Sequence, residues 1–87
     1  MIQYKGGDGS SKEKAIIILG ANSEFEGVDA EYVWLEEKFS KQDINWELIF
    51  QQLIIEESKE YDILRIKFFS GEIKEFWFDK SDFYGRE

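Results

Sequence analysis

The sequence predicts a small α+β domain in which one main helix packs on an antiparallel sheet. Two observations carry this prediction: one stretch has apolar residues at helical spacing, and two later stretches alternate apolar and polar residues around a two-residue turn. A chain of 87 residues has room for one domain, residues 1–87, and 43% apolar residues are enough to build its core. No motif is specific enough to name a family.

The helix is expected at about residues 27–40. A stripe of apolar residues spaced by four, three and four lies on one helical face: Val28, Tyr32, Leu35 and Phe39. Most of the charged residues are expected on the opposite face, Glu31 among them. Ser23 with Glu26, or Asp29 itself, has the chemistry to cap the start of the helix.

Four strands are expected, at about residues 15–19, 46–55, 61–69 and 72–79. The first, AIIIL, is a short apolar run typical of a strand buried on both faces. The last two strands are joined by Ser-Gly, a hairpin signal. Residues 46–55 fit a helix as well as a strand, and the hairpin that follows them favours the strand. Residues 1–14 are expected to be a partly flexible, glycine-rich segment.

The C-terminal stretch FWFDKSDFYG combines a strand end with a turn. Phe76 and Phe78 are expected to point into the core, and Trp77 to the opposite face. Asp79 is placed to cap a single helical turn that Gly85 ends. The pattern therefore favours a structural role over a catalytic site, and it leaves open what covers Trp77.

A single helix covers only one face of the sheet. The other face is then expected to expose a large set of apolar residues: Ile49, Leu53, Ile55, Ile63, Phe69, Ile73 and Trp77. Such a surface is larger than a monomer usually leaves in water. Either the N-terminal segment or another chain covers it, and a homodimer through this face is one hypothesis.

The charge is strongly negative, with 19 acidic and 11 basic residues and a net charge of −8. An acidic chain repels phosphate backbones, so nucleic-acid binding is not expected. No apolar run is long enough to span a membrane, and we expect a soluble, cytoplasmic protein.

Residues 15–37 contain acids but no basic residue, which is typical either of a solvated helix face or of a docking surface for a basic protein. We therefore expect a non-enzymatic interaction module, for example an inhibitor or immunity-type protein. Its candidate partner-binding residues are Glu24, Glu26, Asp29, Glu31, Glu36, Glu37, Trp34, Trp77 and Phe69.

Several chemistries are excluded by the residue types. Without histidine or cysteine there is no Ser-His-Asp triad, no thiolate nucleophile and no zinc site of the usual kind. The loop GGDGSSK lacks the spacing of a phosphate-binding loop. We expect no catalytic residues, cofactor or metal. The alternative is a small-molecule or weak metal-binding domain that uses the glycine-rich loop with Asp79 and Asp82.

Overall fold

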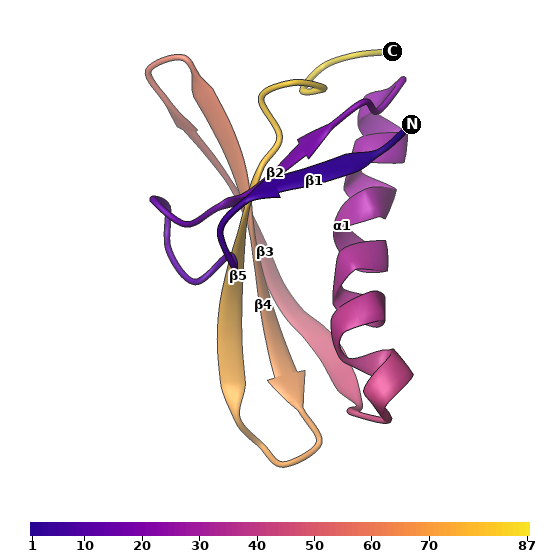
Figure 1. The fold of residues 1–87 in the computed structure, drawn as a ribbon. Helices are drawn as coiled ribbons and strands as arrows, with labels where there is room; N and C mark the ends of the chain where they lie inside the picture. The colour runs from indigo at the N-terminus through magenta and orange to yellow at the C-terminus, as the bar shows by residue number, and fades with distance from the viewer.

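The computed structural model of the protein describes residues 1–87, and it has one α-helix packed on one face of a five-stranded sheet (Figure 1). The α+β class predicted from the sequence is confirmed. The elements in chain order are β1 (Gln3–Gly6), β2 (Ile16–Leu19), α1 (Glu24–Lys38), a 3-10 turn η1 (Ser40–Gln42), β3 (Trp46–Glu56), β4 (Lys59–Phe68) and β5 (Ile73–Asp79). No helix has the length and apolar composition that crossing a membrane requires.

The strands lie in the order β1-β2-β5-β4-β3, so β1 and β3 form the two edges. The sheet is mixed where the sequence predicts antiparallel pairing throughout, because β2 pairs in parallel with β5. The reason is the path of the chain. α1 carries it back along the sheet, so β3 runs in the direction of β2, and two hairpins return β5 to that direction. β1 lies where the sequence predicts no strand.

The ambiguous stretch from residue 46 is a strand, as the hairpin signal favoured. A bulge between Leu48 and Phe50 shifts its register, so Leu53 pairs with Asp62 and Gln51 with Leu64 on the face that carries the helix. The expectation that Leu53 and Ile55 share the open face with Ile63 is therefore wrong. The sequence shows no signal for the bulge, and one extra residue exchanges the two faces.

The helix begins three residues earlier than predicted. Ser23 caps it, since its hydroxyl accepts a hydrogen bond from the backbone N–H of Glu26 at 3.1 Å. The Glu26 carboxylate in turn accepts from the backbone N–H of Asn22 at 3.2 Å. The Ser23 bond satisfies one free N–H group of the first helical turn, and the Glu26 bond holds the residue that precedes the cap, so the cap lies at Ser23 as its spacing from Glu26 predicts.

The core lies between α1 and the sheet. Its buried residues come from α1, from β2, β4 and β5, and from the two flanking loops: Ile16, Ile18, Ala21, Ala30, Leu35, Leu64, Ile66, Phe68, Phe76, Phe78 and Phe83. Of the predicted helical stripe only Leu35 is fully buried, and Val28 and Tyr32 lie half-buried at its margin. The helix is thus rotated slightly from the predicted orientation, and its small residues Gly27 and Ala30 face the core.

The C-terminal turn forms as predicted. Asp79 accepts a hydrogen bond from the backbone N–H of Ser81 at 2.9 Å, and Phe83 folds back into the core. Trp77 lies half-buried on the opposite face. Its ring meets the ring of Tyr61 edge to face, with 5.7 Å between the two ring centroids. Its backbone N–H donates to the carbonyl of Gly9 in the glycine-rich loop. From the same loop Lys12 reaches Glu56 on β3, with its Nζ 2.7 Å from the carboxylate, so Tyr61 and the N-terminal segment cover part of the open face.

Candidate partner-binding surface

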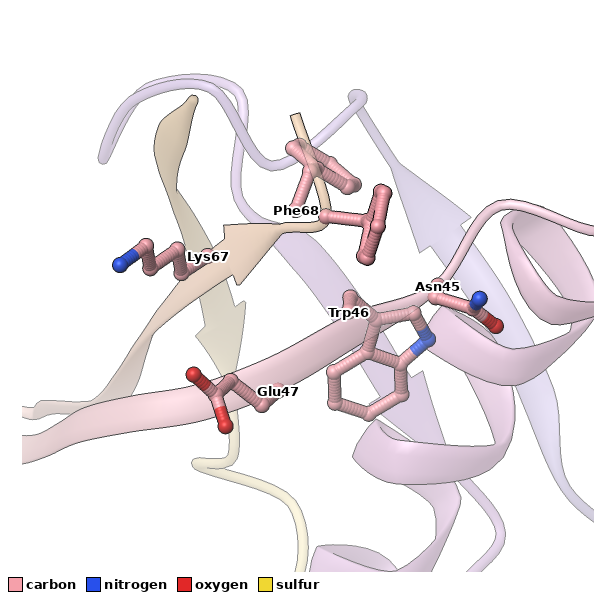
Figure 2. Close-up of a pocket in the computed structure, with 6 residues that line it drawn as sticks. Asn45, Trp46, Glu47, Lys67 and Phe68 are labelled. Atoms are coloured by element: carbon pink, nitrogen blue, oxygen red, sulfur yellow. The ribbon is translucent and has the colours of Figure 1, made fainter. Parts of the chain in front are cut away.

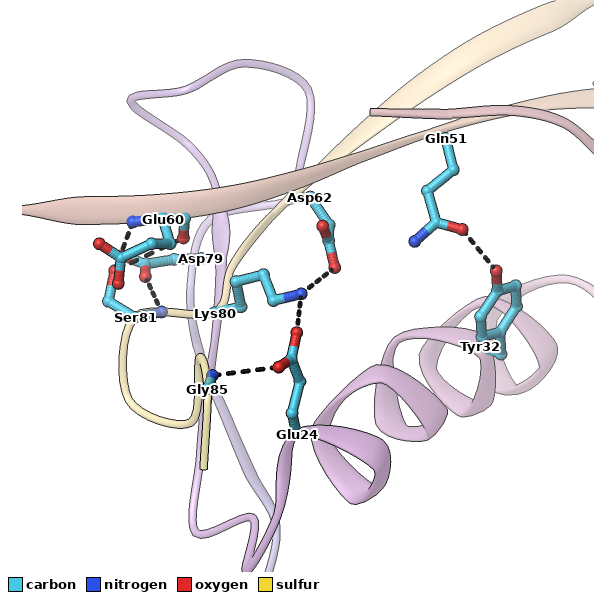
Figure 3. Close-up of polar contacts among 9 residues, drawn as sticks. All are labelled: Glu24, Tyr32, Gln51, Glu60, Asp62, Asp79, Lys80, Ser81 and Gly85. Atoms are coloured by element: carbon cyan, nitrogen blue, oxygen red, sulfur yellow. Dashed lines mark hydrogen bonds and ion pairs between the residues drawn. The ribbon is translucent and has the colours of Figure 1, made fainter. Parts of the chain in front are cut away.

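Three of the predicted acidic residues have partners within the chain. The Glu24 carboxylate lies 3.0 Å from Nζ of Lys80 and accepts from the backbone N–H of Gly85 (Figure 3). The contact with Lys80 lowers the pKa of Glu24. Glu26 belongs to the helix cap, and Glu37 pairs with Lys41 at 2.8 Å. These three carboxylates are occupied by contacts that organise the fold.

Glu31 is buried completely, which contradicts its predicted place on the outer face of the helix. The rotation of α1 turns its carboxyl group inward, toward β4. Burial, together with the neighbouring Asp62 carboxylate, raises the pKa of Glu31 to about 10. Glu31 is therefore neutral at pH 7, and it contributes no charge to the surface.

Lys80 follows the end of β5 and connects the C-terminal turn to the start of α1 and to β4. Its Nζ is 3.0 Å from Asp62 on β4 and 3.0 Å from Glu24 on α1, as Figure 3 shows. Burial alone would lower the pKa of Lys80, but its contacts with Glu24 and Asp62 outweigh this and raise the pKa. We call Glu31, Asp62 and Lys80 the buried charge cluster, and Glu24 lies at its exposed margin.

The buried charge cluster contains an acid and a base, yet it is closed to substrates. Glu31, Asp62 and Lys80 are all buried, and none of them lines a hollow described below. A paired carboxyl group acts on a substrate only if the substrate can reach it. The cluster holds α1, β4 and the C-terminal turn together, and we assign it a structural role.

A hollow of about 240 Å³ opens on the outer side of α1. It is lined by residues at positions i, i+3, i+4 and i+7 of the helix: Phe25, Val28, Asp29 and Tyr32. Phe25 is 75% exposed although it is a large apolar residue. The Tyr32 hydroxyl lies 3.2 Å from Oε1 of Gln51 on β3, which fixes that ring at one side of the hollow (Figure 3). We call these four residues the α1 hollow.

Asp29 gives the α1 hollow its charge. It takes part in none of the ion pairs of the structure, and Glu36, two turns further along the same side of the helix, is also unpaired. On the neighbouring strand β1, partial burial and the charges of Asp29 and Glu37 raise the pKa of Tyr4. The outer face of α1 therefore presents free negative charge next to exposed apolar side chains.

The three predicted aromatic residues do not lie together. Trp34 packs on the core, with its ring 5.6 Å from Phe76 and 5.7 Å from Phe78 between centroids. Trp77 lies on the other face. Phe69 is 91% exposed just after the end of β4, and it lines a second hollow, of about 320 Å³, with Trp46 and Phe68. Figure 2 shows the side chains of Trp46 and Phe68 next to each other in this hollow.

The residues of the alternative site are held by local contacts. Asp79 lies 3.2 Å from Nζ of Lys59, and Asp82 accepts from the backbone N–H of Gly20 at 3.3 Å. In the glycine-rich loop, Asp8 accepts from the backbone N–H of Ser10. Each of the three aspartates therefore has a structural contact: Asp8 within its own loop, Asp82 with the loop after β2, and Asp79 with β4.

The sequence identified Asp29 and Glu36 but not Phe25, and it placed Val28 and Tyr32 in the core, where they are half-buried at the margin and also line the α1 hollow. The available signal was Phe25 itself, an aromatic residue beside the predicted cap and off the apolar stripe. Comparisons with protein-family models, with curated proteins and with solved structures returned no match, so the geometry alone describes the site.

Proposed function

We propose that this protein is a non-enzymatic interaction module that binds a basic protein, and that a lysine or arginine side chain of the partner enters the α1 hollow. One observation carries the proposal: Asp29, an unpaired carboxylate, lies in a hollow whose other three residues are apolar or aromatic. Lysine and arginine have a long apolar stem and a charged head. The stem would pack on Phe25, Val28 and Tyr32, and the head would meet Asp29.

The rest of the chain supports the same choice of partner. The net charge of −8 attracts a basic protein at long range and speeds its association at low salt. Phe25, Val33 and Tyr32 supply apolar contact area between the free carboxylates of Asp29 and Glu36. An apolar centre with a charged rim is the usual composition of a transient interface.

The test begins with capture of basic proteins from the source cell on the immobilised protein at low salt, with elution by salt. The affinity of the purified partner is then measured by calorimetry for the wild type and two variants. Asp29→Asn removes the carboxylate of the α1 hollow, and the matched control Glu37→Gln removes one from the same helix outside it. We expect about a tenfold or larger loss of affinity for Asp29→Asn and little change for the control.

Equal losses in both variants would mean that only the overall charge attracts the partner, and the α1 hollow would be rejected as the binding site. If the immobilised protein captures no basic protein that salt then elutes, the proposed function itself is rejected.

A further inference from the structure

The two edges of the sheet differ in length and in protection. β1 has four residues and carries Lys5, whereas β3 has eleven residues and pairs only with β4. One side of β3 therefore presents backbone N–H and C=O groups to water. Proteins usually protect such an edge with a lysine, a proline, a bulge or a covering segment. β3 contains neither lysine nor proline, and its bulge lies near one end, which leaves Phe50–Glu56 regular.

β3 is also apolar and uncharged along most of its length. Residues 48–55, LIFQQLII, carry no charge in a chain with 30 charged residues. Five of its large apolar side chains are between 36% and 57% exposed: Leu48, Ile49, Phe50, Leu53 and Ile55. Because of the bulge they lie on both faces of the strand, so the helix cannot cover them all.

We propose that a second copy of this chain pairs with β3 through its own β3, antiparallel, to form one continuous sheet. Two copies of a strand related by a twofold axis run antiparallel, and the same residues then serve on both sides. The axis would lie near Gln51 and Gln52, in the middle of the uncharged stretch. Two copies with a net charge of −8 repel each other over most of their surfaces. Residues 48–55 contain no carboxylate, so this stretch can pair with its copy without placing like charges opposite each other.

The exposed area is that of a weak dimer. At about 200 Å² for a whole large apolar residue, the five exposed side chains leave roughly 400 Å² per copy in water. Edge pairing keeps both faces of the sheet in water and covers only the part of these side chains beside the new strand, so the pair falls below the roughly 1,200 Å² at which stable specific interfaces begin. Backbone hydrogen bonds between the edges add to this, as in other cases of strand addition. We expect a dissociation constant on the order of micromolar.

This dimer goes beyond the proposed function and leaves its site free. α1 packs on a face of the sheet (Figure 1), and of the four residues of the α1 hollow only Tyr32 has a hydrogen bond to β3, to the side chain of Gln51. Edge pairing through the β3 backbone therefore leaves Asp29 free. The two associations also respond to salt in opposite ways. Salt weakens the attraction of a basic partner, but it screens the repulsion between two acidic copies and strengthens the dimer.

Sedimentation equilibrium tests the dimer with two matched variants. Gln52→Lys places a positive charge at the middle of β3, where it meets its copy, and Gln3→Lys places the same charge on the other edge strand. Both changes reduce the net charge from −8 to −7, which by itself favours association. We expect the wild type and Gln3→Lys to dimerise, more tightly at about 0.5 M than at about 0.05 M salt, and Gln52→Lys to weaken the dimer at least tenfold.

Hydrogen exchange of the wild type locates the interface. Amides of residues 48–55 that point away from β4 should exchange slowly at high protein concentration and fast at low concentration. A wild type that is monomeric at several hundred micromolar overturns the proposal. So does a dimer that Gln52→Lys leaves intact, or one without protection on β3. None of these outcomes bears on capture of a basic partner by α1.

Discussion

Nζ of Lys80 lies 3.0 Å from a carboxylate oxygen of Asp62, and the two side chains are only 5% and 2% exposed. Lys80 follows the end of β5 and Asp62 lies on β4, so the pair ties the C-terminal turn to the middle of the sheet. A carboxylate removed from water in this way depends on its partner for most of its compensation. Losing this pair should therefore cost more than losing an exposed ion pair.

Replacing Lys80 with methionine should destabilise the protein strongly. The change keeps the side-chain length but leaves the Asp62 carboxylate buried without a cation, next to Glu31. We expect a loss of about 3–5 kcal/mol in the free energy of unfolding, measured by urea denaturation at pH 7.

The control for this change is Lys41→Met. Lys41 also pairs with a carboxylate, Glu37, but both side chains are more than half exposed, so we expect a loss below about 1 kcal/mol. The double variant Lys80→Met Asp62→Leu should regain most of the stability, because no unpaired charge then remains in the core. A Lys80→Met protein that is as stable as Lys41→Met would contradict the role given to the pair.

Glu31 should make the protein less stable as the pH rises. Its pKa is about 10 in the folded protein and 4.5 in the unfolded chain, so between these values the folded state holds a proton that the unfolded state releases. Stability is then fully present below pH 4.5 and falls by up to about 1.4 kcal/mol per pH unit above it. The groups that face Glu31 are Asp62, Lys80 and Glu24, with Tyr32 beside it on the helix.

Urea denaturation between pH 5 and pH 8 measures this slope, and Glu31→Gln removes the titrating group. We expect the wild type to lose stability over this range and the variant to change little, so that the variant is the more stable protein at pH 8. The lowered pKa of Glu24 acts in the opposite direction, but only in acid, where that carboxylate gains a proton. A wild type with no slope in this range contradicts the prediction.

The sequence predicts well where one pattern allows one structure. Ser-Gly identified the position of the β4–β5 hairpin, although Phe69 joins Ser70 and Gly71 in the loop and the predicted two-residue turn is therefore one residue too short. Ser23 with Glu26 identified the helix cap, and the alternation of Phe76 and Phe78 identified the core face of β5. Each of these signals is local and depends on a few neighbouring residues.

What the sequence could not predict depends on distant segments. The helical pattern places Glu31 on the surface, but the rotation of α1 buries it beside Asp62 and Lys80, which lie far along the chain. The bulge at Ile49 that exchanges the faces of β3 has no glycine to mark it. The α1 hollow was missed for a related reason, since its existence depends on how far the helix is rotated on the sheet.

Gly27 is a third position where local rules mislead. It lies inside α1, where alanine is preferred over glycine by about 1 kcal/mol. In the folded protein, however, the space that a Cβ atom would occupy is already filled by the ring of Phe83. Phe83 is fully buried and closes the core beneath the C-terminal turn, so the ring has no free direction in which to move.

Gly27→Ala should therefore destabilise the protein by about 1–3 kcal/mol, although helix propensity alone predicts a gain. Thermal or urea unfolding measures the difference, and Glu36→Ala, at an exposed position of the same helix, is the control, with an expected change within about 0.5 kcal/mol. Adding Phe83→Leu should make Gly27→Ala less costly than it is beside phenylalanine, because the smaller side chain leaves room for the methyl group. If Gly27→Ala stabilises the protein, the close packing of α1 on Phe83 is wrong.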